Sequence, residues 1–259
     1  MGKIKGQNKK NLDLIVLMAG EGRRMRPLTI DRPKSLLRCD DGISIFGHIV
    51  KAFSTLNVRL HVIPVIGHGA DKVHEEVKKL NLENNCIYNP FYNTAGPLIS
   101  LWLGLLQSKS ENVVVVNGDT IVDESLTKQL GLWFDEKQTI ENLVAGLCTS
   151  KTNELENDDM KVLLDNQHNF IEVGKHIHHN DTSVKSAGVF CVKGADSKKV
   201  LLKKMDRLLM DNKTTLKKYH WHNILNVIKS DFQVDLIEVK LNSWSEMDTP
   251  SELEIINAQ

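Results

Sequence analysis

A segment rich in glycine and arginine follows the first apolar stretch of the sequence. Ala19, Gly20 and Gly22 have little or no side chain, so the backbone N–H groups of this loop can approach an anion closely. Residues 21–38 carry six basic side chains and two acidic ones, a local charge of +4. Guanidinium and ammonium groups bind phosphate-like anions. The segment therefore predicts a polyanion site, with a glycine turn beside a solvated basic surface as the simpler interpretation.

Two aspartates far along the sequence have positions suited to binding a metal ion. Asp119 follows the apolar run 113–116, just past the end of an expected strand, where ligands of open α/β sheets bind. Asp248 follows Trp244-Ser-Glu-Met, beside another expected strand end. Mg²⁺ takes one or two carboxylates together with substrate phosphates. Considered singly, a turn explains Asp119 equally well, and a helix cap explains Asp248 equally well.

Alternating strands and helices are expected to position these residues. Strands are expected at 12–18, 59–66 and 113–117, and helices at 44–56, 70–80 and 98–107. This alternation predicts an α/β fold with a mainly parallel sheet flanked by helices. Four successive valines at 113–116 indicate a strand that is covered on both faces.

The pattern changes beyond about residue 150, after the polar stretch 151–159. Strands are expected at 161–164, 170–173, 188–193 and 234–239, helices at 197–210 and 216–228, and a final helix start at Thr249. No repeat or linker separates the two parts. We therefore expect a flexible basic tail over 1–11 and one domain over 12–259, with an insertion around the site in its second half.

Composition excludes several classes of protein. The 259 residues hold 33 Lys and Arg against 33 Asp and Glu, so no bulk charge favours a nucleic-acid partner. No apolar run is long enough to span a membrane, and the basic N-terminus lacks the apolar core of a secretory signal. The four cysteines are scattered without CxxC spacing. A reducing, cytoplasmic location is expected.

A long ordered match points to one family. Leu17-Met-Ala-Gly-Glu-Gly-Arg-Arg-Met-Arg-Pro-Leu-Thr29 and Pro33-Lys-Ser-Leu-Leu37 resemble the signature LAAGxGxRLxPLT…PKxLL. That signature belongs to the nucleotidyltransferases, which include sugar-1-phosphate nucleotidyltransferases and small cytidylyltransferases. Asn117-Gly-Asp119 and the segment 244–253 resemble further elements of the same family. The resemblance covers about 12–257 and implies a Rossmann-like sheet, with 12–150 as the nucleotide-binding half and 151–259 as the acceptor-binding half.

The resemblance also implies roles for single residues. Arg24 and Lys34 would hold the triphosphate, and Asp119 and Asp248 would bind Mg²⁺, with Glu246 as a weaker candidate near the metal. The residues expected to line the nucleotide from the first loop are Leu17, Ala19, Gly20 and Gly22.

The middle of the chain is similar to one branch of that family. The stretch 88–103 looks like the NPFY…N…SLWLA stretch of cytidylyltransferases that use phosphocholine or aminoethylphosphonate, and 171–175 resembles their EIGK element. By this likeness Lys175 contacts the acceptor phosphate, while Asn93, Ala95 and Ser100 help to form the base pocket. Two departures count against a choline-like acceptor. Residues 93–96 partly resemble the GTAG stretch of sugar nucleotidyltransferases, and 184–186 lack a usual acid.

The activity implied is transfer of a nucleotide from an NTP, chiefly CTP, to a small phosphorylated or phosphonate acceptor. The products would be a CDP-linked molecule for cell-surface polysaccharide or phosphonate biosynthesis, and pyrophosphate. A sugar-1-phosphate nucleotidyltransferase using UTP, dTTP or GTP is the alternative, and a silent nucleotide sensor is an alternative of another class. The family often dimerises, so the resemblance makes a homodimer possible, whereas the residues themselves do not indicate an oligomeric state. The histidines of 176–179 and 220–222 are expected in polar loops rather than around zinc.

Overall fold

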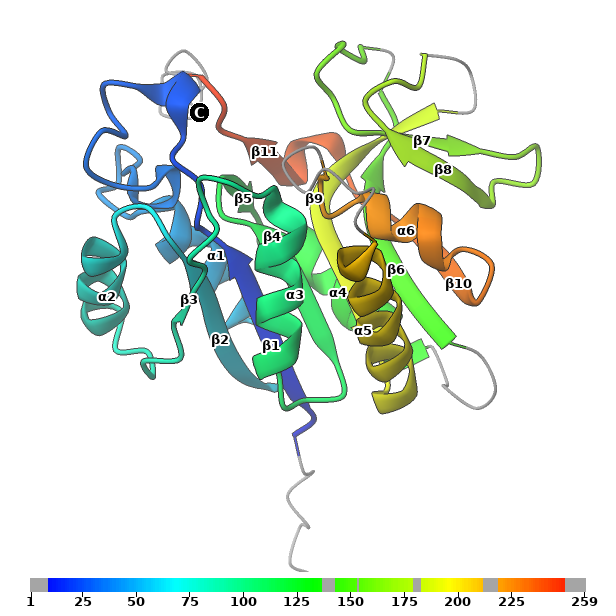
Figure 1. The fold of residues 1–259 in the computed structure, drawn as a ribbon, viewed down its shortest axis with the longest axis horizontal. Coiled ribbons are helices and arrows are strands. Elements are labelled where there is room, and N and C mark those ends of the chain that lie inside the picture. Colours follow the sequence, from blue (N-terminus) through cyan, green and yellow to red (C-terminus); the bar gives the residue numbers. More distant parts are fainter. Residues whose placement is uncertain (1–8, 137–142, 153, 179–182, 212–218, 250–259) are drawn as a thin grey trace, which may run out of the picture.

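The computed structural model describes residues 9–136, 143–152, 154–178, 183–211 and 219–249. A nine-stranded sheet forms the centre of this part of the chain (Figure 1). Its main path has the order β10-β6-β9-β4-β1-β2-β3, and β7 and β8 join it through β9. The strands are β1 (Asn11–Leu17), β2 (Arg59–Ile66), β3 (Ile87–Tyr88), β4 (Val113–Asn117), β6 (Leu143–Ser150), β7 (Lys161–Leu164), β8 (Phe170–Gly174), β9 (Ser183–Lys193) and β10 (Phe232–Glu238).

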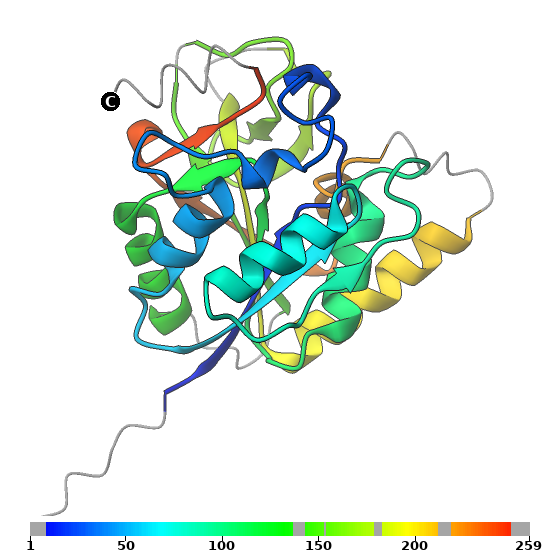
Figure 2. The ribbon, with the colours of Figure 1, turned by 90° about the vertical axis from the view of Figure 1, so that its left-hand side faces the viewer.

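Helices cover both faces of the sheet, which confirms the α/β prediction (Figure 2). They are α1 (Ile45–Phe53), α2 (Ala70–Lys79), α3 (Pro97–Gln107), α4 (Glu124–Glu136), α5 (Ala195–Met210) and α6 (Asn223–Ile228). In β4, Val114 and Val116 pack in the core on the side of α1 and α4, whereas Val113 and Val115 pack on the side of α3 and α5. The run of valines is therefore explained by burial on both faces.

Strand β9 joins the two halves of the sheet. The pairs β1–β2, β1–β4, β2–β3 and β6–β10 are parallel, but β9 is antiparallel to both β4 and β6. Because β9 runs the other way, its first residues lie at the edge where β4 ends. Residues from the second half of the chain thus reach the carboxyl edge of the first half's strands.

Most expected elements agree with the structure, and some do not. The strands at 59–66, 113–117 and 161–164 have the expected bounds. The helix expected over 216–228 is wrong over 219–222, which precede helix α6 and include a turn at 221–222, and its first residues, 216–218, lie outside the described part. Strand β6 and helix α4 were not expected. The helix expected to begin at Thr249 falls on residues that lie outside the described part.

The described residues contain no helix long and apolar enough to cross a membrane.

A buried carboxylate fixes the end of the sheet opposite the carboxyl edge. Asp13, on β1, is 2% exposed and accepts hydrogen bonds from Ser108 Oγ, Lys109 N and Ser110 N at 2.7–2.9 Å. Burial would raise the pKa of Asp13, but the hydrogen bonds from Ser110, Ser108 and Lys109 outweigh it and hold the pKa below its usual value. The carboxylate therefore anchors the loop that leads from α3 into β4.

We predict that Asp13→Asn lowers the free energy of unfolding by about 1–3 kcal/mol at pH 7. The amide of Asn would direct an N–H donor toward the hydroxyl and N–H groups of the 108–110 loop, which already act as donors. The folded-state pKa is lowered, so the carboxylate's contribution is present above about pH 3.9 and is lost as the pH falls further. Urea unfolding from pH 7 down to pH 3 should show the gap between variant and wild type narrowing. Glu75→Gln, on the exposed side of α2, is the control. A gap independent of pH would contradict this account.

Candidate active site

A cavity of about 300 Å³ lies where β1 and β4 end side by side, with Leu17 opposite Asn117. Open α/β sheets bind ligands at this edge. Both halves of the chain contribute to its walls. The lining residues are Leu17, Ala19, Gly20, Arg24, Asn89, Tyr92, Ala95, Gly96, Pro97, Ser100, Asn117, Asp119, Asp158, Met160, Lys175, His220, Trp221, His222, Glu246 and Asp248.

A small two-stranded sheet brings the two aspartates together. Strand β5 (Thr120–Val122) pairs with β11 (Trp244–Glu246), and Thr120 lies opposite Glu246. Asp119 precedes β5 and Asp248 follows β11, and a hydrogen bond of 3.0 Å joins Met247 N to Asp119 O. Pairing of these two strands explains how residues 129 positions apart in the sequence line one cavity.

Lys34 lies between the two carboxylates. Its Nζ is 2.6 Å from Asp119 Oδ2 and 2.6 Å from Asp248 Oδ1. Burial would lower the pKa of Lys34, but Asp119 and Asp248 outweigh it and hold the pKa above its usual value. In Asp248, burial raises the pKa, but Lys34 and Arg24 outweigh this and hold it below the usual value. Lys34 and Asp248 are therefore both charged at neutral pH.

Gly22 gives the Lys34 side chain room to pass. Gly22 has φ +57°, in the left-handed region that favours glycine. A Cβ at this position would come within 2.7 Å of Lys34 Cγ and 3.2 Å of Thr29 Cγ2. Gly22 and Lys34 line a small cavity of about 70 Å³ beside the main one, together with Asp119. Glycine is thus required at position 22 because the Lys34 side chain passes directly beside it.

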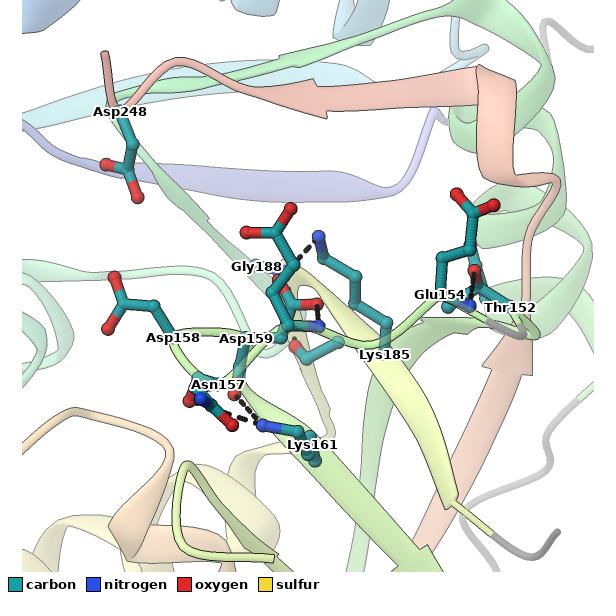
Figure 3. Close-up of polar contacts among 12 residues, drawn as sticks. Thr152, Glu154, Asn157, Asp158, Asp159, Lys161, Lys185, Gly188 and Asp248 are labelled. Carbon is teal, nitrogen blue, oxygen red and sulfur yellow. Dashed lines mark hydrogen bonds and ion pairs between the residues drawn. The ribbon is translucent and has the colours of Figure 1, made fainter. Parts of the chain in front are cut away.

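A second group of charges lies on the opposite wall. Asp158 Oδ2 is 2.6 Å from Arg24 Nη1, and Asp158 Oδ1 is bonded to Lys175 Nζ. Arg24 also reaches Asp248, with Nη2 2.9 Å from Oδ2. In Figure 3 the carboxylates of Asp158 and Asp248 point toward the same space. Arg24 therefore links residues from three distant parts of the chain.

Glu246 lies among these charges without an equivalent cation of its own. Burial first, and then the carboxylates of Asp119 and Asp248, raise the pKa of Glu246 to about 8. Lys185 has the opposite effect, but its Nζ is paired with Asp159 Oδ1 at 2.6 Å. At neutral pH, Glu246 is therefore mostly protonated and can donate a hydrogen bond into the cavity.

The segment 220–222 contributes to the wall of the cavity, and the expectation of a polar loop flank is wrong for Trp221 and His222, which are buried, whereas His220 is exposed. Trp221 is 1% exposed and His222 is 4% exposed, and their rings stack with centroids 3.5 Å apart. Trp221 Nε1 donates to Asn117 Oδ1 at 2.7 Å, and His222 Nε2 is 3.0 Å from Ser186 Oγ. Burial, with His220 and Lys175 nearby, holds the pKa of His222 well below its usual value. A neutral imidazole and an indole thus form this wall.

Several residues expected around the nucleotide do share the cavity. Leu17, Ala19 and Gly20 line it from the first loop, and Ala95 and Ser100 line it from the start of α3. Ser100 Oγ accepts a hydrogen bond of 2.9 Å from Asn89 Nδ2. The structure does not bring Asn93 into the cavity, because its side chain is exposed, and Tyr92 lines the wall instead.

The carboxylates of Asp119 and Asp248 are the oxygen donors of the site that could bind Mg²⁺. Within the described residues, no three His, Cys, Asp or Glu side chains form a metal-binding group. Two carboxylates nevertheless meet on one ammonium, and a pair of carboxylates completed by substrate phosphates is a usual set for Mg²⁺. The residues therefore fit a magnesium ion that arrives together with a phosphate-bearing substrate.

Residues of the second half were the hardest to find from the sequence. Asp158 lies within the polar stretch 151–159, where no acid is distinguished from its neighbours. Lys175 had a motif to mark it, whereas Trp221 and His222 did not. The only available signal for the last two was an aromatic residue between two histidines, which does not indicate burial.

Known proteins resemble the chain in sequence and in fold. It is 37% identical to the bifunctional protein GlmU of Paracoccus denitrificans over 111 residues, 43% of this chain and 24% of GlmU. It is 34% identical to mannose-1-phosphate guanyltransferase beta-B of Xenopus laevis over 116 residues, 42% of this chain and 31% of that protein. The chain thus spans about a quarter to a third of these relatives.

Two solved structures share the fold over nearly the whole chain. CTP:phosphocholine cytidylyltransferase (LicC) of Streptococcus pneumoniae has a TM-score of 0.72 at 14% identity, covering 95% of this chain and 98% of its own. The inositol-1-phosphate CTP transferase of T. maritima has a TM-score of 0.73 at 19% identity, covering 96% of each chain.

One family model matches just over half of the sequence. It matches residues 14–145, which include the loop of Gly22, Lys34 and Asp119. Its description is the MobA-like NTP transferase domain. The chain belongs to this family of NTP transferase domains.

Proposed function

We propose that the protein is a Mg²⁺-dependent nucleotidyltransferase that joins an NTP to a small phosphorylated or phosphonate acceptor. One observation carries the proposal. Lys34, Asp119 and Asp248, from three distant parts of the sequence, meet in a single set of ion pairs beside the cavity. A purely structural role would account for the ion pairs themselves. It would not account for their position at the carboxyl edge of the sheet, among glycines of a phosphate-binding type.

In the proposed reaction an oxygen of the acceptor phosphate attacks the α-phosphorus of the NTP. A new P–O bond forms, the bond from the α-phosphorus to the bridging oxygen breaks, and pyrophosphate leaves with the electron pair. A phosphate oxygen is already an adequate nucleophile, so the protein's task is placement and stabilisation of charge. Lys34 and Arg24 hold the triphosphate and stabilise the departing pyrophosphate, and Lys175 orients the acceptor.

Asp119 and Asp248 would hold the metal ion, whose charge offsets that of the phosphates. The protein's own residues do the rest. Ala19 and Gly20 allow the nucleotide to approach the backbone, and Ser100 and Ala95 form the wall toward the base. The four cysteines are all free thiols, which fits our proposal of a cytoplasmic enzyme.

We propose CTP as the nucleotide. Both solved structures described above carry CTP in their names, and both match almost the full length of this chain. The sequence likeness to a mannose-1-phosphate guanyltransferase favours the alternative, a sugar-1-phosphate nucleotidyltransferase with a different NTP. A nucleotide sensor without turnover is disfavoured, because Lys34 and both aspartates are retained and paired.

We predict that Lys34→Ala lowers the rate of pyrophosphate release by about 10²–10³-fold, the usual cost of removing one donor that stabilises transition-state charge. Arg23→Ala is a matched control, because Arg23 lies in the same loop, pairs only with Glu21 among the described contacts and has a side chain that is 71% exposed. The control should keep nearly the wild-type rate. A Lys34→Ala variant that melts normally and releases pyrophosphate at the wild-type rate would sink the proposal.

We expect Asp119→Asn to raise the magnesium concentration needed for half-maximal rate by about tenfold or more. Loss of an outer-shell partner alone costs about 10–100-fold in metal affinity, and loss of a direct ligand should cost at least as much. A magnesium titration of the transfer rate measures the shift. Asp135→Asn makes the same chemical change at a surface pair with Lys10 and should leave the titration unchanged. Equal magnesium dependence in both variants would exclude Asp119 as a ligand.

The four NTPs, assayed with a panel of phosphorylated acceptors, separate the three proposed activities. We expect the fastest pyrophosphate release with CTP. Preference for GTP, UTP or dTTP with a sugar 1-phosphate would favour the alternative enzyme. If no pair releases pyrophosphate while an NTP still raises the melting temperature, the chain is a sensor.

A further inference from the structure

Asp158 occupies the position between two cations that the proposed reaction assigns to different substrates. One carboxylate oxygen pairs with Arg24 at 2.6 Å, and the other pairs with Lys175. Asp158 lines the cavity, although its side chain is 58% exposed. Arg24 is proposed to hold the triphosphate and Lys175 the acceptor phosphate. The carboxylate therefore lies where phosphate oxygens of both substrates would have to bind.

Hydrogen bonds from the buried Lys161 hold the main chain on both sides of Asp158. Lys161, on β7, is 4% exposed, and its Nζ donates to the carbonyl oxygens of Asn157 and Asp159 at 3.3 and 3.4 Å (Figure 3). The same Nζ donates to the carbonyl oxygen of Lys175 at 3.5 Å. Asp159 is also paired with Lys185 at 2.6 Å. These contacts fix the loop and tie it to the end of β8. The position of the Asp158 carboxylate is thus set by buried neighbours, which distinguishes it from an acid on a free surface loop.

Asp158 carries its charge at neutral pH. The hydrogen bond from Lys175 holds the pKa of Asp158 below its usual value, against a smaller opposing effect of burial, and Arg24 adds to the lowering. The paired cations and carboxylates of the site neutralise one another. Its cations are Arg24, Lys34 and Lys175, and its paired carboxylates are Asp119, Asp158 and Asp248.

We propose that Asp158 is a built-in competitor for the substrates' phosphates, an internal anion that they must displace from Arg24 and Lys175. The inference rests on the proposed function. Asp158 weakens the binding of every anion, but the cost matters most for a small one, which has few other contacts to offset it. A full nucleotide also contacts the glycine loop and the wall around Ser100. The carboxylate thus keeps the affinity for free phosphate and pyrophosphate low, and its return to Arg24 and Lys175 promotes pyrophosphate release.

The test is calorimetric titration of inorganic pyrophosphate into wild type, Asp158→Asn and Glu154→Gln, all in EDTA so that no divalent cation takes part. Glu154 is an exposed acid of the same loop, so its variant makes the same change of charge away from Arg24 and Lys175. We expect Asp158→Asn to bind pyrophosphate about five- to thirtyfold more tightly than wild type, the upper part of the roughly two- to thirtyfold range that the loss of two exposed ion pairs allows. Glu154→Gln should stay within about twofold of wild type.

Equal or weaker binding by Asp158→Asn, or no measurable binding, would overturn the proposal, as would equal tightening in Glu154→Gln. Melting temperatures of the three proteins exclude misfolding as the cause. Transfer assays on the same proteins separate this inference from the proposed function. If pyrophosphate binding tightens but no NTP supports transfer, the proposed activity fails and the role of Asp158 stands. If transfer occurs but the affinities are equal, only the role of Asp158 fails.

Discussion

One ammonium group holds the site together. Lys34 lies between Asp119 and Asp248, so a loop near the start of the chain is bonded to both strands of the β5–β11 pair. Two carboxylates this close repel one another, and the cation between them offsets the repulsion. The basic segment 21–38 is therefore in direct contact with the carboxylates of Asp119 and Asp248. The paired cations and carboxylates of the cavity balance one another, as the charges of the whole sequence do.

The antiparallel strand β9 makes this arrangement possible. A wholly parallel sheet would place the start of each strand at the edge away from the ligand. Because β9 is reversed, Ser186 lies at the carboxyl edge, where its hydroxyl contacts His222. The β7–β8 hairpin is attached to the same strand and carries Lys161, whose amine supports the loop of Asp158. The cavity wall contributed by the second half of the chain thus depends on the reversed direction of β9.

The sequence predicted the first half of the molecule better than the second. Strand β4 was predictable because a strand buried on both faces requires a continuous apolar run, and Lys34 and Asp119 lie in ordered motifs. Strand β6 was not predicted. It includes Gly146, where a Cβ would come within 2.8 Å of Ile237 Cδ1, so a contact with a distant residue rather than local strand propensity determines the residue at this position. Asp158 and His222 owe their positions to residues far away in the chain, and local patterns do not record such contacts.

The contact between Gly22 and Lys34 has a consequence for how such a site changes through evolution. Any side chain at position 22 would collide with the lysine stem, and the positive φ adds strain. The lysine can therefore be lost while the glycine stays, but a side chain at position 22 requires both a displaced lysine stem and a backbone that tolerates the positive φ. In a related sequence, a substituted glycine thus marks a loop whose path has changed, and with it the position of the lysine.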